Sequence, residues 1–405
     1  MKRKLVSMLL ASAMVCSLLT GCGSTASTET TTAASTEAAE ATTEAATLPA
    51  AGEEDNIIKI GVVCAMTGGS AIYGEGAQNA VDMAVEEINA AGGDYTVEIV
   101  NGGKVVDDAK DSKQAVNAYN SLIPDGPEAV VGSFFSSVTL PMAELANSQG
   151  MLLLASGATN KDVTLTGPTI FRDCFIDPYQ GKMAAQFASE QGAKKAAVIY
   201  AKDDDYSNGL MAAFVENAEA AGIEIAYTGE CTTTDTDFTA QASQAVASGA
   251  DFVFYPCFLD TVPLFVQQIR DAGYEGMIMG GDGWDGSDTT GLETYFDKCY
   301  FTNHYSSEDT SEAVQSFVSK YTEKYGTESL NACAALYYDA IHMLVEAAKN
   351  GGGSDTASLV KGMTGMTFSG VGGTFTMDEN GDPEKAVVIN TYEDGQIKWL
   401  ETLEP

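Results

Sequence analysis

Apolar runs alternate with amphipathic stretches along most of the chain, and this pattern predicts a repeated strand–helix arrangement. The run IIKIGVVCAM at 57–66 is apolar throughout, as expected for a strand buried on both faces. After it, apolar residues recur at i, i+3, i+4 and i+7 from Val81, and they predict a helix from about Glu75 to the glycine pair 92–93.

The alternation continues to about residue 350, after which short strands and tight turns follow. Further strands are predicted at 96–104, 128–134, 151–156, 195–201, 223–230, 251–257, 276–281 and 300–305. Further helices are predicted at 108–123, 142–149, 210–221, 238–248, 262–272, 313–324 and 334–349. Repeated units of this kind form parallel sheets with helices on both faces. Two successive sets predict an α/β fold with two doubly wound parallel-sheet lobes.

Five polar or aromatic loops follow predicted strands, where open α/β sheets bind their ligands. Three belong to the first lobe and two to the second, which predicts a binding cleft between the lobes. The loops are Gly68–Gly76, Ser133–Thr139, Ser156–Asn160, Asp203–Asn208 and Gly280–Ser287.

The N-terminus indicates export. Basic residues at 2–4 and an apolar stretch at 5–19 have the order of a secretory signal peptide, and the stretch is too short to span a bilayer. Cys22 after small residues resembles a bacterial lipoprotein box, which implies a signal peptide at 1–21 and lipidation of Cys22; an ordinary signal peptide with an incidental cysteine is the alternative. Residues 22–55 are rich in Thr, Ala and Glu and predict a disordered tether.

Composition excludes several partners and cofactors. The formal net charge is −36, which argues against nucleic acid and anionic lipid surfaces as partners. With only two histidines and no C-x-x-C pair after the signal peptide, we predict no metal and no cofactor. Six further cysteines lie mostly in apolar runs and are predicted to be buried free thiols: Cys64, Cys174, Cys231, Cys257, Cys299 and Cys333.

Two loops of the first lobe carry hydroxyl groups at strand ends. Ser136 and Ser137 precede a predicted helix, where hydroxyls and backbone N–H groups suit a carboxylate. Helix capping is the other interpretation of this pair. Thr159, in the Ser156–Asn160 loop, repeats the pattern one strand later, with a simple turn as its alternative.

The second lobe offers acids on its loops. The 203–209 loop, DDDYSNG, fails the calcium-binding pattern and is interpreted as helix capping with an inward Tyr206. The loop GGDGWDGS at 280–287 matches G-x-G-x-x-G but lacks the helix that a nucleotide loop needs. Asp282 is therefore predicted to face an ammonium group, or else to hold the turn. No activated nucleophile is evident, and we predict that the protein is not an enzyme.

Several blocks together resemble the type I periplasmic binding proteins, especially the leucine/isoleucine/valine-binding proteins of ABC importers. The resemblance covers about 57–399 and is carried by IKIGVVCAMTGGSAIYGEGAQNAVDMAVEEINAAGG, VVGSFFSSVTLPMAELANSQGMLLLASGATN, TIFRDCFIDPYQGKMAA, GGDGWDG and FSGVGGTFTMDENGDP. It implies two lobes joined by three crossings, near Phe175–Pro178, Phe301–His304 and Thr367–Gly370. The implied lobes are 56–175 with 304–367, and 176–303 with 368–405.

The resemblance also implies roles for individual residues. Ser136 and Thr159 would hold the ligand α-carboxylate, and the Gly157 carbonyl, the Thr159 hydroxyl and Asp282 would hold the α-ammonium. The remaining implied site residues line the side-chain pocket: Tyr73, Phe135, Tyr206, Phe258 and, adjacent in sequence, Trp284.

These features predict a substrate-binding lipoprotein of an ABC importer. It would be a monomer, anchored through Cys22 to the outer face of the bacterial cell membrane, and it would pass its ligand to the permease. The expected ligand is a small α-amino acid, branched-chain or otherwise apolar. The alternative is a sensory module of the same fold that binds amides, urea or nucleobases.

Overall fold

The computed structural model describes residues 56–405, which lie within one compact unit. The predicted signal peptide, the tether and lipidated Cys22 fall outside the described residues. Within 56–405, every helix is too short or too polar to traverse a bilayer.

The first sheet is parallel and has the order β2-β1-β4-β5-β6, with β3 also paired to β1. Its strands are β1 (Ile57–Cys64), β2 (Thr96–Ile99), β3 (Val106–Asp107), β4 (Ala129–Val131), β5 (Leu152–Ala155) and β6 (Ile170–Arg172). From Gly61 to Cys64 every residue of β1 is buried, which is the pattern of a central strand covered on both faces. We call the part built on this sheet the first lobe.

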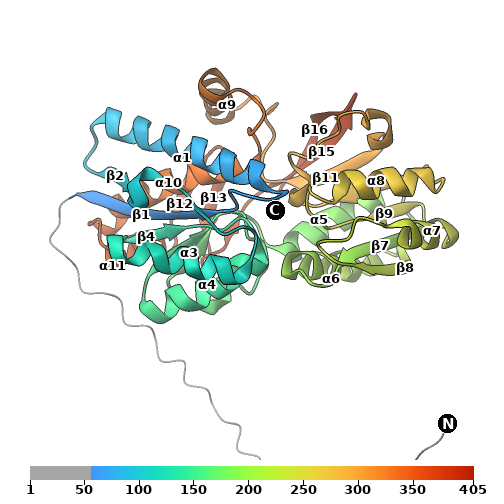
Figure 1. The fold of residues 1–405 in the computed structure, drawn as a ribbon, viewed down its shortest axis with the longest axis horizontal. Coiled ribbons are helices and arrows are strands. Elements are labelled where there is room, and N and C mark those ends of the chain that lie inside the picture. Colours follow the sequence, from blue (N-terminus) through green and yellow to red (C-terminus); the bar gives the residue numbers. More distant parts are fainter. Residues whose placement is uncertain (1–55) are drawn as a thin grey trace, which may run out of the picture. The chain divides into compact units, whose positions relative to one another are not determined.

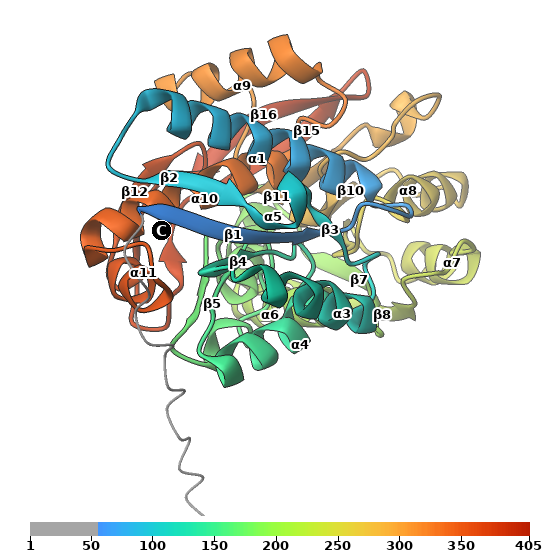
Figure 2. The same cartoon turned by 60° about the vertical axis from the view of Figure 1, so that its left-hand side comes forward.

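Helices cover both faces of the first sheet. In Figure 2, α1 and α10 lie on one side of β1, and α3 and α4 on the other. The helices of this lobe are α1 (Ala71–Ala91), α2 (Val100–Gly103), α3 (Ser112–Leu122), α4 (Ser136–Gln149), α9 (Glu312–Tyr325), α10 (Ala332–Gly351) and α11 (Thr356–Met363), with 3₁₀ turns η1 (Ile123–Asp125) and η2 (Thr164–Thr166).

The second sheet defines the second lobe and is mixed. Its order is β16-β15-β11-β10-β9-β7-β8, and only β15 runs opposite to the other strands, antiparallel to both β11 and β16. The strands are β7 (Lys195–Ala201), β8 (Glu224–Cys231), β9 (Phe252–Phe254), β10 (Met277–Gly280), β11 (Cys299–Asn303), β15 (Val387–Glu393) and β16 (Gln396–Leu403). The described chain therefore has the two-lobed α/β architecture that the strand–helix alternation predicts.

Alternate residues of β9 pack against helices on opposite faces of the second sheet. Phe252 and Phe254 stack on Phe214 of α6, whereas Val253 joins the cluster of Phe265 on α8. Figure 1 shows these helices around the sheet. They are α5 (Asp177–Glu190), α6 (Asp205–Ala220), α7 (Thr239–Ala247) and α8 (Val262–Asp271), with 3₁₀ turns η3 (Asp282–Trp284) and η4 (Glu293–Phe296). The cores also bury the six cysteines of residues 56–405 as free thiols.

A third, antiparallel sheet changes where the last crossing between lobes falls. It consists of β12 (Thr367–Gly370), β13 (Gly373–Met377) and β14 (Pro383–Glu384). The turn between β13 and β14 contacts the first lobe, where Asp382 pairs with Arg172 at 2.6 Å. Only from Val387 does the chain join the second sheet. The boundary after residue 367 that the sequence predicts therefore disagrees with these contacts, and we propose that the third crossing lies between Glu384 and Val387.

Candidate functional site

The loop that enters α4 brings a buried hydroxyl to the end of β4. Phe135 is the N-cap of α4 and no side chain caps this helix, so neither Ser136 nor Ser137 has the capping role considered above. The Ser136 hydroxyl instead accepts a hydrogen bond from the N–H of Asn160 at 3.1 Å, and its side chain is buried. Because the N-terminus of this 14-residue helix carries partial positive charge, the position of Ser136 suits an anion.

The loop after β5 is held in a conformation that requires glycine. Gly157 has φ +98°, and a Cβ there would lie 2.3 Å from the ring of Phe134. Buried Arg172 donates to the carbonyl of Ala158 at 2.7 Å and steadies the loop. The Thr159 hydroxyl is buried and has no hydrogen-bond partner of good geometry. This loop thus presents a buried hydroxyl near Ser136 and the carboxyl of Asp177.

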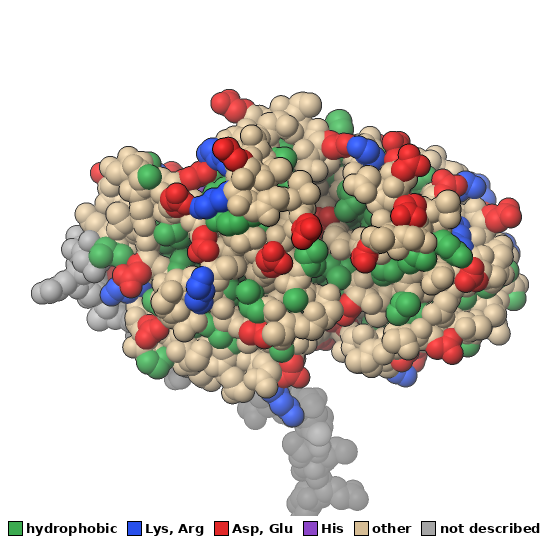
Figure 3. Space-filling view, turned by 45° about the horizontal axis from the view of Figure 1, so that its top comes forward, with side chains coloured by type: hydrophobic (Ala, Val, Ile, Leu, Met, Phe, Trp, Pro, Cys, Tyr) green, Lys and Arg blue, Asp and Glu red, His purple; other side chains and the backbone are tan. Residues whose placement is uncertain are grey.

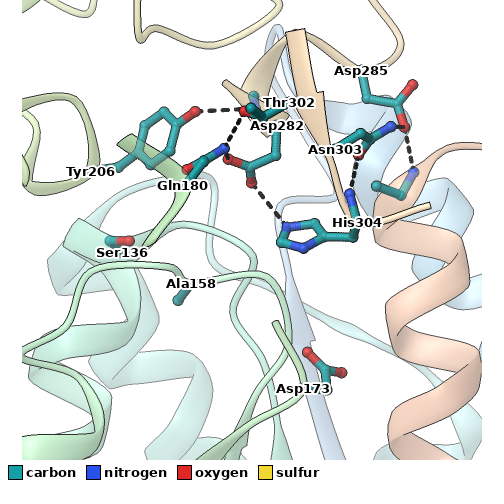
Figure 4. A network of polar contacts seen from close by, with 12 residues as sticks. Ser136, Ala158, Asp173, Gln180, Tyr206, Asp282, Asp285, Thr302, Asn303 and His304 are labelled. Carbon is teal, nitrogen blue, oxygen red and sulfur yellow. Dashed lines mark hydrogen bonds and ion pairs between the residues drawn. The ribbon is translucent and has the colours of Figure 1, made fainter. Parts of the chain in front are cut away.

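Asp282 of the second lobe is buried and its side chain points inward. Figure 4 shows the carboxylate between Gln180 and His304. Gln180 Nε2 donates to Oδ1 at 2.7 Å, and His304 Nε2 lies 3.2 Å from Oδ2. The side chain therefore bonds to other elements, and the alternative in which it holds its own turn does not fit this geometry.

His304 is the second partner of this acid. Burial lowers the pKa of its imidazole below the ordinary value, although the neighbouring Asp282 acts in the opposite direction. A neutral ring that contacts a carboxylate through Nε2 carries its proton there, so Nδ1 is left as a buried acceptor without a partner. The stacked ring of Phe175, 4.0 Å away between centroids, keeps the imidazole in place.

An aromatic wall joins the two sides of the site, and four of the predicted residues belong to it. Ring centroids are 5.9 Å apart for Tyr73 and Phe135, 4.9 Å for Phe135 and Phe258, and 4.7 Å for Phe258 and Tyr206. The Tyr206 hydroxyl accepts a hydrogen bond from the N–H of Gly283, directly beside Asp282. The structure thus brings these rings together next to Ser136 and Asp282.

Trp284 is the predicted site residue that the structure places apart from the others. Its indole N–H donates to the carbonyl of Tyr255 at 2.9 Å, and its ring is fully buried in the core of the second lobe near Phe296. This side chain packs beneath the loop that carries Asp282 and supports it.

Several contacts cross between the lobes around the site. The Tyr73 hydroxyl lies 2.8 Å from the carbonyl of Asp285, and Asn160 Nδ2 donates to the carbonyl of Asp205 at 2.9 Å. Ser137 donates to Asp204, the N-cap of α6, at 2.7 Å. Lys110 pairs with Asp260 at 3.1 Å. Together with Asp204 as a cap and Tyr206 buried, these contacts agree with the interpretation of the 203–209 loop from sequence.

Unpaired buried polar atoms gather beside Asp282. Among the described residues, twelve buried side-chain oxygen or nitrogen atoms have no hydrogen-bond partner. Five of them belong to four neighbouring residues of the site: Thr159 Oγ1, both carboxyl oxygens of Asp177, Gln180 Oε1 and His304 Nδ1. Thr159 and Asp177 also interact with each other, but an atom that stays unpaired costs about 1–3 kcal/mol, so this group indicates a place suited to a polar ligand.

Asp177 adds a second acid to the site. Its N–H donates to the carbonyl of Thr159 at 2.8 Å, which joins α5 to the first-lobe loop. Burial raises the pKa of its carboxyl well above the ordinary value, and the charge of Asp282 raises it further, while the nearby Thr159 hydroxyl lowers it. With its pKa raised in this way, the Asp177 carboxyl adds a polar group beside the charge of Asp282 rather than a second charge.

Sequence reasoning missed Asp177, Gln180 and His304. Asp177 and His304 lie within predicted crossings between lobes, and Gln180 follows the first crossing by two residues, in α5. These residues could have been found as polar residues near a predicted crossing, because a crossing borders any cleft between the lobes. Within residues 56–405, no three His, Cys, Asp or Glu side chains are arranged to hold a metal ion.

Comparison with known proteins places these features in context. A model of a periplasmic binding protein family matches residues 57–396. The Leu/Ile/Val-binding protein homolog 3 of Brucella melitensis is 30% identical over 85% of this chain and 94% of its own. Two crystal structures have a TM-score of 0.79 and cover 86% of this chain: the leucine-binding protein LivK of Thermotoga maritima (29% identity, 99% of that chain) and an isoleucine complex of LivJ from Streptococcus pneumoniae (27%, 100%).

Proposed function

The chain belongs to the periplasmic binding protein family, and from this premise we propose that it is the substrate-binding component of an ABC importer for an α-amino acid. The observation that carries the proposal is the group of unpaired polar atoms at Thr159, Asp177, Gln180 and His304 around buried Asp282. The ligand-binding relatives named above, one of them in complex with isoleucine, agree with this class of ligand.

The two ends of an α-amino acid match the two sides of the site. The carboxylate would accept hydrogen bonds from Ser136, Thr159 and the free N–H groups at the start of α4. The ammonium would lie against Asp282, with the Gly157 carbonyl and Asp177 beside it. Because the two groups of residues come from different lobes, the bound ligand stabilises contact between the lobes.

Charge distinguishes this proposal from a sensory module for amides, urea or nucleobases. An uncharged ligand leaves the buried carboxylate of Asp282 without a counter-charge. The buried guanidinium of Arg172 does not supply one, because it pairs with Asp382 and binds backbone carbonyls. A zwitterion supplies the missing positive charge.

A ligand screen tests the proposal. We expect free α-amino acids to raise the melting temperature of the full chain in a thermal-shift assay, because a ligand that binds the native state stabilises it by mass action. N-acetyl amino acids and amino acid amides, which each lack one charge, should have no effect at the same concentration. Stabilisation by urea, amides or nucleobases in place of amino acids would overturn the proposal.

We further propose from residues 1–22 that the protein acts outside the cytoplasm, anchored to the membrane by lipid on Cys22, and delivers its ligand to a permease as a monomer. Detergent phase partition of the expressed full chain tests the anchor. The wild-type protein should enter the detergent phase and the Cys22→Ser variant should remain aqueous. Equal partition of both proteins would rule out a lipid on this cysteine.

A further inference from the structure

The aromatic wall closes the side-chain end of the proposed amino acid site. Phe135 directly precedes Ser136, and Tyr206 is bonded to Gly283, directly after Asp282. The wall therefore spans the distance from the carboxylate side of the site to the ammonium side. Its four rings are each no more than 4% exposed. A ligand held between Ser136 and Asp282 directs its side chain at these rings.

Phe258 is the centre of the wall and is packed from both lobes. Its ring meets Phe135 of the first lobe edge-on and lies against Tyr206 of the second. A Cβ added to Gly283 would lie 2.8 Å from its Cδ1 atom, so the ring also touches the loop that carries Asp282. With neighbours on these three sides, the ring has no free space into which to withdraw.

Lys110 prevents the rings from moving apart. Its ammonium lies 4.3 Å from the centroid of Phe258 and 5.0 Å from that of Phe135, within the range of a cation–π contact. Asp260 of the second lobe holds the same ammonium at 3.1 Å. The lobes meet closely here, because a Cβ on Gly69 would lie 2.9 Å from that of Asp260. The rings of the wall are therefore held by Lys110 as well as by their contacts with one another.

Little space remains behind the wall. The cavity bordered by Lys110, Asp204, Phe258 and Asp260 has a volume of about 10 Å³. That volume is about the space needed for one water molecule, so Phe258 can shift only slightly in this direction. A longer side chain would have to displace Phe258 against neighbours in both lobes.

We infer that the protein selects α-amino acids with very small side chains, such as glycine, alanine and serine, and that Phe258 and Phe135 exclude larger ones. This inference rests on the proposed function and specifies its ligand. Crowding a packed core by extra methylene groups costs enough to weaken binding by about 5-fold to 100-fold. Leucine should accordingly bind at least about 10-fold more weakly than alanine.

Calorimetric titration of the full chain with alanine and with leucine tests the inference. For the wild-type protein we expect alanine to bind more tightly. In Phe258→Ala the order should reverse, because removal of the ring opens room for the leucine side chain while the groups that hold the backbone of the ligand stay in place. Phe258→Leu, a milder change, should reduce the preference for alanine and provides the test if the alanine variant does not fold.

The matched control is Phe265→Leu. Phe265 is fully buried in the same lobe but stacks on Tyr255 of the core, away from the wall. This variant should lose stability and keep the preference for alanine. Wild-type protein that binds leucine as well as alanine, or a preference that survives in both Phe258 variants, would overturn the inference and leave the proposed function intact. Failure of the folded wild-type protein to bind any of the twenty amino acids would overturn the proposed function itself.

Discussion

Asp282 is the residue whose replacement tests the ammonium site most directly. Its carboxylate is 1% exposed and is the acid that faces the proposed ligand cation. In Asp282→Asn a buried ammonium would lose its counter-charge, and such losses amount to about 3–5 kcal/mol. We expect affinity for the best amino acid to fall by about 100-fold or more, as measured by calorimetry on the full chain.

Asp288→Asn provides the comparison for this prediction. Asp288 lies six residues further on the same loop, is exposed, and accepts a hydrogen bond from the N–H of Thr290. Its replacement removes one negative charge without touching the site, so ligand affinity should stay within about 2-fold of the wild-type value. Equal affinities for the two variants would remove Asp282 from the site.

At the residue scale, the sequence indicated which loops carry site residues, but not which side chains from other elements bond to them. Ser136, Thr159 and Asp282 each follow a strand, and position along the chain was enough to select them. Gln180 and His304 are defined by what they touch, since both bond to Asp282 from more than 20 residues away. The sequence pattern also cannot show on which side of a turn a ring lies, which is why Trp284 was assigned to the pocket although it packs in the core.

Close packing of α5 on α6 sets up the second-lobe side of the site, because α5 carries Asp177 and Gln180. Gly181 lies at the contact, where a Cβ would come within 2.6 Å of that of Ala213 and 2.7 Å of the backbone nitrogen of Phe214. In Gly181→Ala the helices must separate, and crowding of this kind costs about 1–3 kcal/mol. The free energy of unfolding measured in urea should fall by that amount.

Lys182→Ala is the matched control at the neighbouring position. Lys182 is exposed on the same helix, so its replacement should leave the free energy of unfolding within about 0.5 kcal/mol of the wild-type value. Because Gly181 sits next to Gln180, the crowded variant should also bind its amino acid more weakly. A Gly181→Ala variant as stable as the control would show that the helices can adjust without cost.

Where some helices and strands begin and which lobe they join depends on long-range contacts, which the local pattern of apolar residues does not show. The helix predicted at 142–149 begins in fact at Ser136 and includes Pro141. A proline cannot donate to the carbonyl four residues earlier, which belongs to Ser137. The Ser112 hydroxyl donates to that carbonyl instead, at 2.8 Å, and this long-range bond allows the helix to start early. Similarly, the strands after 367 join the first lobe through Arg172 and Asp339 rather than through neighbouring residues.

At the scale of the whole molecule, negative charge dominates both surface and interior. Figure 3 shows acidic side chains spread over one face among fewer basic ones, in keeping with the net charge of −36. Burial also raises the pKa of six described acids inside the lobes, Asp177 and Asp204 among them. Burial raises the pKa of Asp108, Asp285 and Asp339 to about 6, and that of Asp173 to about 7.

These buried acids predict that the protein is most stable at mildly acidic pH. Between about pH 4 and 7 the folded state keeps protons that the unfolded chain has released, so the free energy of unfolding falls as pH rises. Each pKa unit corresponds to about 1.4 kcal/mol per group, and the four acids together amount to several kcal/mol. Melting temperatures of the full chain should therefore decrease steadily from pH 5 to pH 7.5.

Measurements at high salt show whether burial of the acids or repulsion among surface charges causes this decrease in melting temperature. At 1 M salt the screening length is about 3 Å, which suppresses surface repulsion but acts weakly on buried groups. The slope of melting temperature against pH should therefore persist at 1 M sodium chloride. It should flatten near pH 7 in Asp173→Asn, because burial raises the pKa of this acid to about 7 against the hydrogen bond from Ser156 and the charge of Lys385. The exposed Asp94→Asn should keep the wild-type slope. If high salt removed the slope, surface charge would be its cause, because only exposed charges are screened at that distance.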